Sequence, residues 1–297
     1  MTEVVIRPND TIDELKRKIR IATILGTLQA TLTDFRYLRK VWKRNAEEER
    51  LLGVSMTGIM DHPTLSHYSQ GEGNRTLGSI LKDMKEVAIE VNKEWAEKLE
   101  INQSAAIHTL KPSGTVSQLV DSASGIHPRF SPYYLRTVRA DKKDPLADFM
   151  IDKGFYHEED AMNPSNWVFY FPMKSPDGAI TANDFGCMDQ LAIWKEYQDS
   201  WCEHKPSMTA YYRDDEFLKV GQWVWDNIES ISGVSFLPYV EHSYVQAPYQ
   251  EIDKETYERW VESMPKNVDW EEMASYEEGD NTEGSQELAC SSGGCAI

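Results

Sequence analysis

Two cysteines stand close to the C-terminus, in the stretch LACSSGGCAI. Cys290 and Cys295 are separated by Ser-Ser-Gly-Gly, a spacer that is flexible enough to close a small disulfide ring. Thiol–disulfide exchange needs an attacking thiolate that can reach a second disulfide. A pair on a flexible arm has that reach, so it can serve as a redox shuttle. Spacing alone leaves two alternatives open: half a zinc site, for which no nearby His or third Cys completes the four ligands, or two idle thiols.

A second candidate functional segment is TLKPSGTVSQL, residues 109–119. The apolar run before it predicts a buried strand, and the KPSG sequence predicts a tight turn at its end. Backbone N–H groups at such a turn can bind an anion, and the hydroxyls of Ser113, Thr115 and Ser117 add donors. The turn around Gly114 can therefore hold a phosphate, although the P-loop pattern is absent. An ordinary strand-to-helix turn with a capping serine is the simpler alternative.

Basic and imidazole side chains accompany this turn. Arg129, Arg136 and Arg139 follow it in the sequence and place positive charge near the predicted phosphate turn. We expect His108, inside the apolar run, and His127, in a loop, to be structural residues with hydrogen bonds to their surroundings. The other two cysteines of the chain, at 187 and 202, are on or beside a predicted helix and are expected to be buried thiols.

Composition limits the classes of protein to consider. The chain has 297 residues and a formal net charge of -18. Such an acidic surface repels nucleic acid and anionic membranes, which argues against a role in binding either. No run of about 18 apolar residues predicts a membrane span, and the N-terminus has no apolar signal region. Four cysteines do not make a disulfide framework, so we expect a cytoplasmic protein.

Helices and strands that would position these motifs can be read from the periodicity. Two long helical patterns come first, over residues 11–45 and within 71–99. From about residue 104 to 240, strand patterns alternate with helical ones, which predicts βα units in a parallel sheet or barrel. The predicted strands are 104–110, 133–140, 166–175, 206–213 and 234–239, and the predicted helices are 144–154, 185–204 and 214–233.

The composition changes near the C-terminus. Lys266 is the last basic residue, and eight Asp or Glu residues follow it among Gly, Ser and Asn. We therefore expect a folded domain over residues 1–265 and a mobile, solvated arm over 266–297 that carries the cysteine pair.

Together these features resemble the C-terminal part of a ribonucleotide reductase catalytic subunit. LKPSGTVS is similar to the substrate-phosphate loop of the adenosylcobalamin-dependent (class II) enzymes, and the terminal ACSSGGC is similar to their final cysteine pair. Three further stretches, residues 30–63, 124–140 and 235–252, resemble the monomeric type in class II that reduces triphosphates. Class I enzymes end in such a pair too, but they usually carry Glu in place of the loop Gly, so the loop favours class II.

The resemblance implies a fold, a reaction and a set of site residues. It implies an α/β fold, the C-terminal half of a ten-stranded α/β barrel. The activity implied is reduction of ribonucleoside triphosphates, or diphosphates, to 2′-deoxyribonucleotides by a thiyl radical, with adenosylcobalamin as the cofactor. Ser113, Gly114, Thr115 and Ser117 would hold the substrate phosphates. The C-terminal pair would reduce the active-site disulfide and be reduced in turn by a thioredoxin-like protein.

One departure from the family pattern is informative. The family places its radical cysteine before the region matched here, and neither Cys187 nor Cys202 matches it or the active-site reducing pair. We therefore expect an N-terminal half on a separate polypeptide to supply the radical site, and this chain to be inactive alone; a truncated sequence is the other explanation. Two alternatives remain: a non-catalytic nucleotide-binding or thiol-relay subunit, and a fragment of a class I large subunit.

Overall fold

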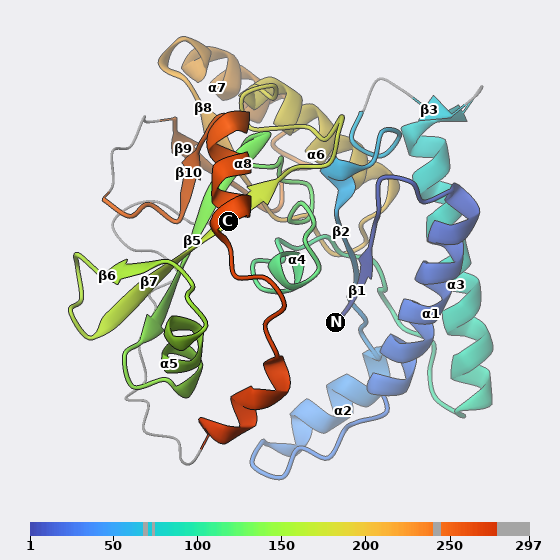
Figure 1. Ribbon diagram of the computed structural model, residues 1–297. Coiled ribbons are helices and arrows are strands. Elements are labelled where there is room, and N and C mark those ends of the chain that lie inside the picture. Colours follow the sequence, from blue (N-terminus) through green and yellow to red (C-terminus); the bar gives the residue numbers. More distant parts are fainter. Residues whose placement is uncertain (68–70, 73–74, 240–244, 278–297) are drawn as a thin grey trace. The chain divides into compact units, whose positions relative to one another are not determined.

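The structure is a computed structural model that describes residues 1–67, 71–72, 75–239 and 245–277, and the chain divides into two compact units (Figure 1). Unit 1 consists of residues 1–129 and 176–239, and the described part of unit 2 consists of residues 130–175 and 245–277. No helix in these described ranges is long and apolar enough to cross a membrane. The division shows that the segment 130–175 leaves unit 1 and the chain then returns to it.

Unit 1 is an α/β unit. Its elements in chain order are β1 (Thr2–Val5), α1 (Ile12–Gln29), α2 (Lys40–Glu49), β2 (Val54–Thr57), η1 (Ile59–Asp61), β3 (Gly71–Glu72), β4 (Arg75–Thr76), α3 (Leu77–Lys98), α4 (Val116–Leu119), α6 (Cys187–Ser200), β8 (Met208–Tyr212), η2 (Asp214–Glu216), α7 (Phe217–Asp226) and β9 (Val234–Pro238). Strands β1 and β2 pair in parallel, as do β8 and β9. The predicted strands 206–213 and 234–239 are thus confirmed in a parallel pair.

The apolar run 104–110 connects these two strand pairs. It is extended and makes isolated parallel bridges, from His108 to Val54 of β2 and from Leu110 to Pro206 just before β8. The carboxylate of Glu203, which follows α6, accepts from the N–H groups of Ile107 and His108. The predicted strand therefore lies where a parallel strand would lie, without a continuous ladder.

The first predicted helix is two helices. A capping box between Thr11 and Glu14 starts α1 as expected, but α1 ends at Gln29 and α2 begins only at Lys40. The sequence between them contains Thr and Asp side chains that compete for backbone hydrogen bonds. The hydroxyl of Thr31, for example, donates to the carbonyl oxygen of Leu28 at 2.7 Å. Local side-chain bonding of this kind ends a helix that apolar spacing alone would continue.

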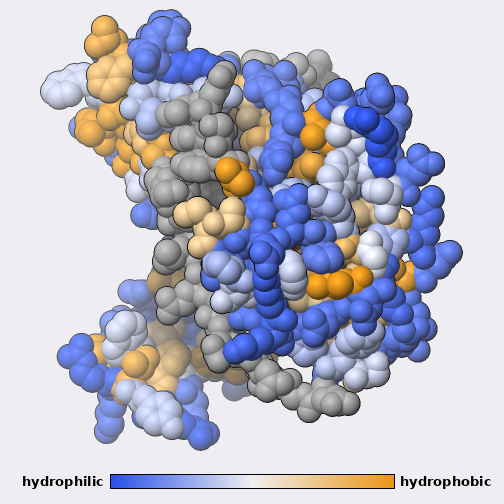
Figure 2. All heavy atoms as spheres, turned by 60° about the vertical axis from the view of Figure 1, so that its left-hand side comes forward, coloured by the Kyte–Doolittle hydropathy of each residue, from blue (hydrophilic) through white to orange (hydrophobic). Residues whose placement is uncertain are grey.

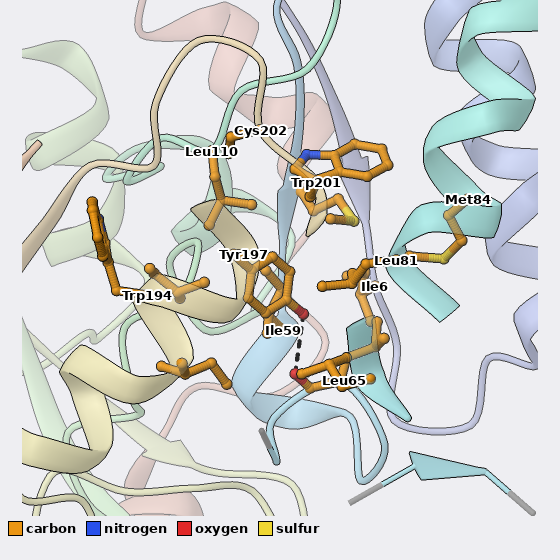
Figure 3. Close-up of a cluster of buried hydrophobic side chains, with 14 of the residues drawn as sticks. Ile6, Ile59, Leu65, Leu81, Met84, Leu110, Trp194, Tyr197, Trp201 and Cys202 are labelled. Atoms are coloured by element: carbon orange, nitrogen blue, oxygen red, sulfur yellow. Dashed lines mark hydrogen bonds between the residues drawn. The ribbon is translucent and has the colours of Figure 1, made fainter. Parts of the chain in front are cut away.

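Helices α3 and α6 pack into the core of unit 1 together with α1, β1 and β2 (Figure 3). Trp194, Tyr197 and Trp201 project from α6 and are fully buried, and Tyr197 donates its hydroxyl hydrogen to the carbonyl oxygen of Leu65 at 3.0 Å. The indole N–H of Trp201 donates to the carbonyl oxygen of Thr109 at 3.0 Å. These two bonds tie the core helix to segments that approach the phosphate-type turn.

The outer face of α7 remains exposed. Phe217, Leu218 and Trp225 are 60%, 82% and 77% exposed. Figure 2 shows that the face turned toward the viewer is otherwise largely hydrophilic, with apolar side chains gathered in places. The helix ends at Asp226, seven residues before the predicted end at Gly233, because the side chain of Asn227 donates to the carbonyl oxygen of Trp223 at 2.8 Å.

Unit 2 is built on an antiparallel sheet. Its elements are β5 (Tyr133–Asp141), α5 (Pro145–Asp152), β6 (His157–Glu159), β7 (Asn166–Lys174), β10 (Tyr249–Glu251), α8 (Lys254–Ser263) and η3 (Trp270–Ser275). The strand order is β10-β5-β7-β6, and every neighbouring pair is antiparallel. The prediction of a parallel arrangement throughout residues 104–240 is therefore wrong for this unit, because β7, which follows α5 and β6, runs antiparallel alongside β5.

The predicted barrel is confirmed only as an α/β fold. Within the described residues, the sheets have two, four, two and two strands, and none of them closes on itself. The ten-stranded barrel remains a prediction for a larger assembly.

The first part of the predicted arm after Lys266 is packed against unit 2. Trp270 and Tyr276 lie against Phe149 of α5, with ring centroids 5.4 and 5.3 Å away. The hydroxyl of Tyr276 also donates to Asp152 at 3.0 Å. Aromatic contacts thus hold the chain to unit 2 as far as Tyr276, and the rest of the predicted arm lies outside the described residues.

Candidate functional site

The phosphate-type turn is anchored from both sides in unit 1. It starts where the extended segment 107–110 ends, and the N–H of Lys111 donates to the hydroxyl of Ser55 on β2 at 3.2 Å. The N–H of Ser113 donates to the hydroxyl of Ser124 at 2.8 Å. Gly125 has φ +55°, and a Cβ there would lie 2.9 Å from the carbonyl oxygen of Lys111. The close approach of two backbones at this point requires a glycine.

Two of the predicted phosphate ligands point inward. Ser113 is 7% exposed and Ser117 is fully buried. The hydroxyl of Ser117 donates to the carbonyl oxygen of Ser113, and its N–H donates to the same oxygen at 3.0 Å. Both residues therefore shape the turn from inside it, and their hydroxyls do not face solvent in this structure.

The other two predicted ligands face outward. Gly114 and Thr115 are exposed, and a Cβ added to Gly114 would meet nothing within 4 Å. No described residue accepts a hydrogen bond from the N–H groups of Gly114, Thr115 or Val116. Three consecutive N–H groups and one hydroxyl are thus open to a ligand above the turn. Such a set of donors is suited to an anion with several oxygen atoms.

A buried ion pair forms the floor of this region. Arg129 binds Asp61 through two hydrogen bonds of 2.8 and 2.9 Å, and their side chains are only 4% and 2% exposed. A third guanidinium nitrogen donates to Asp121 at 2.8 Å. The charge of Arg129 is therefore neutralised within the fold, so the expectation that it adds positive charge to the turn is wrong. Asp61 is not among the site residues predicted from the sequence, because no local pattern distinguishes it.

The other two predicted arginines belong to unit 2. Arg139 pairs with Asp160 at 3.0 Å, and Arg136 donates to the hydroxyl of Tyr249 across the sheet. Both therefore have partners within the sheet of that unit. A cation that unit 1 does place on the turn is Lys111, whose ammonium group donates to Ser207 at 2.7 Å. Because Lys111 stands two residues before Ser113, its place at the turn could have been predicted from the sequence.

Both histidines discussed above are structural, as expected. His127 donates from Nδ1 to the carbonyl oxygen of Ser124 at 3.1 Å and accepts at Nε2 from the N–H of Thr209 at 3.2 Å. Burial lowers its pKa and keeps the ring neutral, which fits one donor and one acceptor. His108 is fully buried and bonds through Nδ1 to Glu203 at 2.8 Å.

The internal cysteines are buried, as predicted. Burial raises the pKa of Cys187 to about 11 and that of Cys202 to about 12, so neither is a thiolate near neutral pH. Cys290 and Cys295, the predicted shuttle pair, lie outside the described residues. The described residues contain no group of three or more His, Cys, Asp or Glu side chains that could hold a metal ion.

A cleft of about 350 Å³ lies beside the turn, between Pro112 and the N-terminal ends of β8 and β9. It is polar at one end, where Lys205, Ser207 and Thr209 contribute, and Ser232 and Ser235 add further hydroxyls. Because Lys111 reaches Ser207, the cleft and the turn share a wall. This shared wall gives a ligand on the turn room to extend.

The fold matches part of the fold of a solved class II ribonucleotide reductase. A solved structure titled as a B-12 dependent (class II) ribonucleotide reductase superposes with a TM-score of 0.75 at 21% identity, covering 94% of this chain and 42% of that one. No protein-family model matches the chain.

Curated proteins similar to this chain carry the names of triphosphate reductases. The adenosylcobalamin-dependent ribonucleoside-triphosphate reductase of Lactobacillus gasseri is 27% identical over an alignment of 288 positions, which covers 89% of this chain and 38% of that protein. The enzyme of that name from Euglena gracilis is 26% identical over 88% of the chain, and a probable one from Dictyostelium discoideum is 26% identical over 97%. The chain spans about 38% of the length of the first of these relatives. The chain is therefore similar to part of the adenosylcobalamin-dependent ribonucleoside-triphosphate reductases, and the resemblance noted in the sequence is confirmed.

Proposed function

We propose that this chain supplies the substrate-phosphate loop and the shuttle dithiol of a reductase that converts ribonucleoside triphosphates to 2′-deoxyribonucleotides by a thiyl-radical mechanism. The names of the relatives support the reaction class. The observation that carries the assignment of the loop is the open space above Gly114, beside three N–H groups without acceptors. The rest of such a reductase, on this polypeptide or another, supplies the radical cysteine.

The loop binds phosphate oxygens from outside and is held in shape from inside. The N–H groups of Gly114, Thr115 and Val116 and the hydroxyl of Thr115 donate to the phosphates. Ser117 holds the carbonyl oxygen of Ser113 and so keeps the turn tight. Lys111 contributes a positive charge at the edge of the loop. This arrangement offsets the overall negative charge of the protein locally, where an anionic substrate must bind.

The C-terminal thiols complete the cycle. Reduction of one ribose oxidises two active-site thiols to a disulfide. Cys290 and Cys295 transfer two electrons and two protons to that disulfide and become a disulfide themselves. A thioredoxin-like protein then reduces them by the same exchange. Cys187 and Cys202 take no part, because both are buried with raised pKa values.

Adenosylcobalamin, when bound to the complete reductase, supplies the radical that starts the reaction. Two clefts of unit 1, of about 350 and 280 Å³, are too small for a corrinoid. We therefore assign no cobalamin contact to the described residues. The chain's own contribution is to bind the phosphates and to carry reducing equivalents.

A glycine substitution tests the loop without disturbing the fold. Gly114→Ala adds a methyl group that meets no protein atom but occupies the space of a phosphate. Gly221→Ala in α7 also meets nothing within 4 Å and is the matched control. Calorimetric titration with ATP should show binding for the wild type and for Gly221→Ala, and at least tenfold weaker binding for Gly114→Ala. Equal affinities for all three proteins would contradict the assignment of the loop.

Turnover tests the rest of the proposal. Reconstitution with the remaining part of such a reductase should give adenosylcobalamin-dependent reduction of a ribonucleoside triphosphate, with no turnover by this chain alone. Nucleotide binding without turnover in the reconstituted protein would favour a non-catalytic nucleotide-binding or thiol-relay subunit. A requirement for a metalloprotein subunit in place of adenosylcobalamin would favour a class I reductase.

A further inference from the structure

Strands β1 and β2 have one apolar and one polar face. Their register pairs Glu3 with Ser55 and Val5 with Thr57. Successive side chains of a strand point to opposite faces, so Glu3, Ser55 and Thr57 share a face. Thr57 donates its hydroxyl hydrogen to the carbonyl oxygen of Ala123 at 2.8 Å. The polar face therefore lies under the segment that forms and supports the phosphate loop, as the position of α4 beside these strands in Figure 1 illustrates.

Two polar atoms in this layer have no hydrogen-bond partner among the described residues. They are the Oε1 atom of Glu3 and the hydroxyl oxygen of Ser113, and both are buried. The hydroxyls of Ser113 and Ser55 lie beside the Glu3 carboxyl and favour its ionised form, but burial outweighs them and raises the pKa of Glu3. A half-buried carboxylate with one buried oxygen is less stable than a carboxylate in water, whereas a protonated carboxyl can donate to a neighbouring hydroxyl.

Charged groups on the surrounding elements are engaged elsewhere. Lys111 donates to Ser207, Arg129 pairs with Asp61, His108 bonds to Glu203, and the N-terminal amine donates to Gln29. No ion pair to Glu3 is formed by any described residue. When this carboxyl is ionised, no neighbouring cation compensates its negative charge. Ionisation therefore changes the electrostatic potential at the loop.

We propose that Glu3 is a positioning residue that makes phosphate binding by the loop depend on proton binding. In its protonated form the carboxyl donates a hydrogen bond to the Ser113 hydroxyl and holds the loop without adding charge beneath it. Loss of the proton to solvent reverses that bond, so that the hydroxyl donates to the carboxylate, and it leaves a negative charge under the bound phosphates. The inference rests on the proposed function, because it takes the loop to be the phosphate site.

Glu3→Gln is the informative variant. The amide keeps the size of the side chain and a donor for Ser113, but it carries no charge at any pH. The matched control is Glu86→Gln, which removes the same charge from an exposed position on α3. The probe is inorganic tripolyphosphate, titrated calorimetrically into the wild type and both variants at several values between pH 5 and pH 8. Comparing proteins at the same pH removes the titration of the probe itself.

The expected result is a pH-dependent ratio of affinities. Near pH 8, Glu3→Gln should bind tripolyphosphate about three- to tenfold more tightly than the wild type, because the variant lacks the repulsion between a negative charge beneath the loop and the phosphates. The ratio should fall toward one as the pH drops and Glu3 becomes protonated. Glu86→Gln should follow the wild type throughout. Circular dichroism of all three proteins checks that the fold is retained.

Two outcomes overturn the inference and are distinguishable from each other. If Glu3→Gln binds with the same affinity as the wild type at every pH, or more weakly at every pH, Glu3 does not couple proton and phosphate binding. In that case Gly114→Ala still weakens binding of tripolyphosphate, and the proposed phosphate loop stands. If Gly114→Ala binds tripolyphosphate as the wild type does, the loop is not the phosphate site and both proposals fail.

Discussion

The guanidinium of Arg129 and the carboxylate of Asp61 meet through two nearly equal hydrogen bonds, 2.8 and 2.9 Å long, across 68 residues of sequence. The same carboxylate accepts from the N–H of Ala123 at 2.9 Å. The pair therefore fastens the segment that precedes Arg129 to η1. The hydroxyl of Ser124, in that segment, accepts from the backbone of the phosphate loop.

Removing one partner of this pair should be strongly destabilising. Asp61→Ala leaves the Arg129 charge with only part of its compensation in a site that is almost completely buried. We expect the free energy of unfolding, measured with urea, to fall by about 3–5 kcal/mol. Asp34→Ala, which breaks an exposed pair with Arg36, is the control and should cost less than about 1 kcal/mol. Similar decreases in the free energy of unfolding for the two variants would show that the buried pair contributes no more to stability than the exposed pair.

Acidification should destabilise unit 1 through His127. Burial lowers the pKa of this histidine in the folded state, so the unfolded state binds protons more readily. Its contribution to stability is present above about pH 6.5, the unfolded value, and is lost as the pH falls below it. Protonation of Nε2 would also set two donors against each other, because Thr209 donates to that atom.

The variant His127→Gln isolates this effect. It should be less stable than the wild type at pH 8, because the ring contacts are lost, but should lose less stability between pH 7 and pH 5. Part of the dependence should remain, since burial also lowers the pKa of His108. Urea unfolding at four pH values measures both slopes. An identical slope in the variant would rule out His127 as a source of the acid sensitivity.

The four cysteines should divide into two reactivity classes. With pKa values of about 11 and 12, Cys187 and Cys202 hold about one thiolate in a thousand molecules or fewer at pH 8. We expect them to react with a thiol reagent only after unfolding, and the predicted shuttle pair to react within the mixing time. Absorbance kinetics of the reagent, followed by peptide mapping, make the assignment. Four thiols that react at one common rate would contradict the division.

Substitution of one shuttle thiol should separate two routes of reduction. In a reconstituted reductase, Cys290→Ser should keep a single turnover, because the active-site thiols are already reduced. Cycling with thioredoxin should stop, while cycling with a small dithiol that enters the active site should continue. Product formed per enzyme molecule with each reductant is the measurement. Normal cycling with thioredoxin would show that Cys290 is not part of the shuttle.

Capping residues and the periodicity of apolar side chains correctly predicted helices and strands that depend on short-range interactions. Helix α5 follows its N-cap Asp144 and Pro145 as expected, and β7 matches the predicted strand within one residue. Strand β1 and helix α8 were not predicted. Strand β1 has four residues and is stabilised by pairing with β2, so its own sequence is too short to show a strand pattern. The direction of strand pairing in unit 2 was equally inaccessible, since alternation of helix and strand occurs in both parallel and antiparallel arrangements.

The sequence by itself determined which residue types are available for chemistry at which spacing: a cysteine pair near the terminus and a serine-glycine-threonine turn after an apolar run. Only the tertiary structure decided how the turn uses its side chains. Ser113 and Ser117 face inward and Thr115 faces outward, because Ser55, Ser124 and the Asp61–Arg129 pair hold the backbone from other parts of the chain. Burial and charge compensation are properties of such long-range contacts, which a turn sequence does not contain.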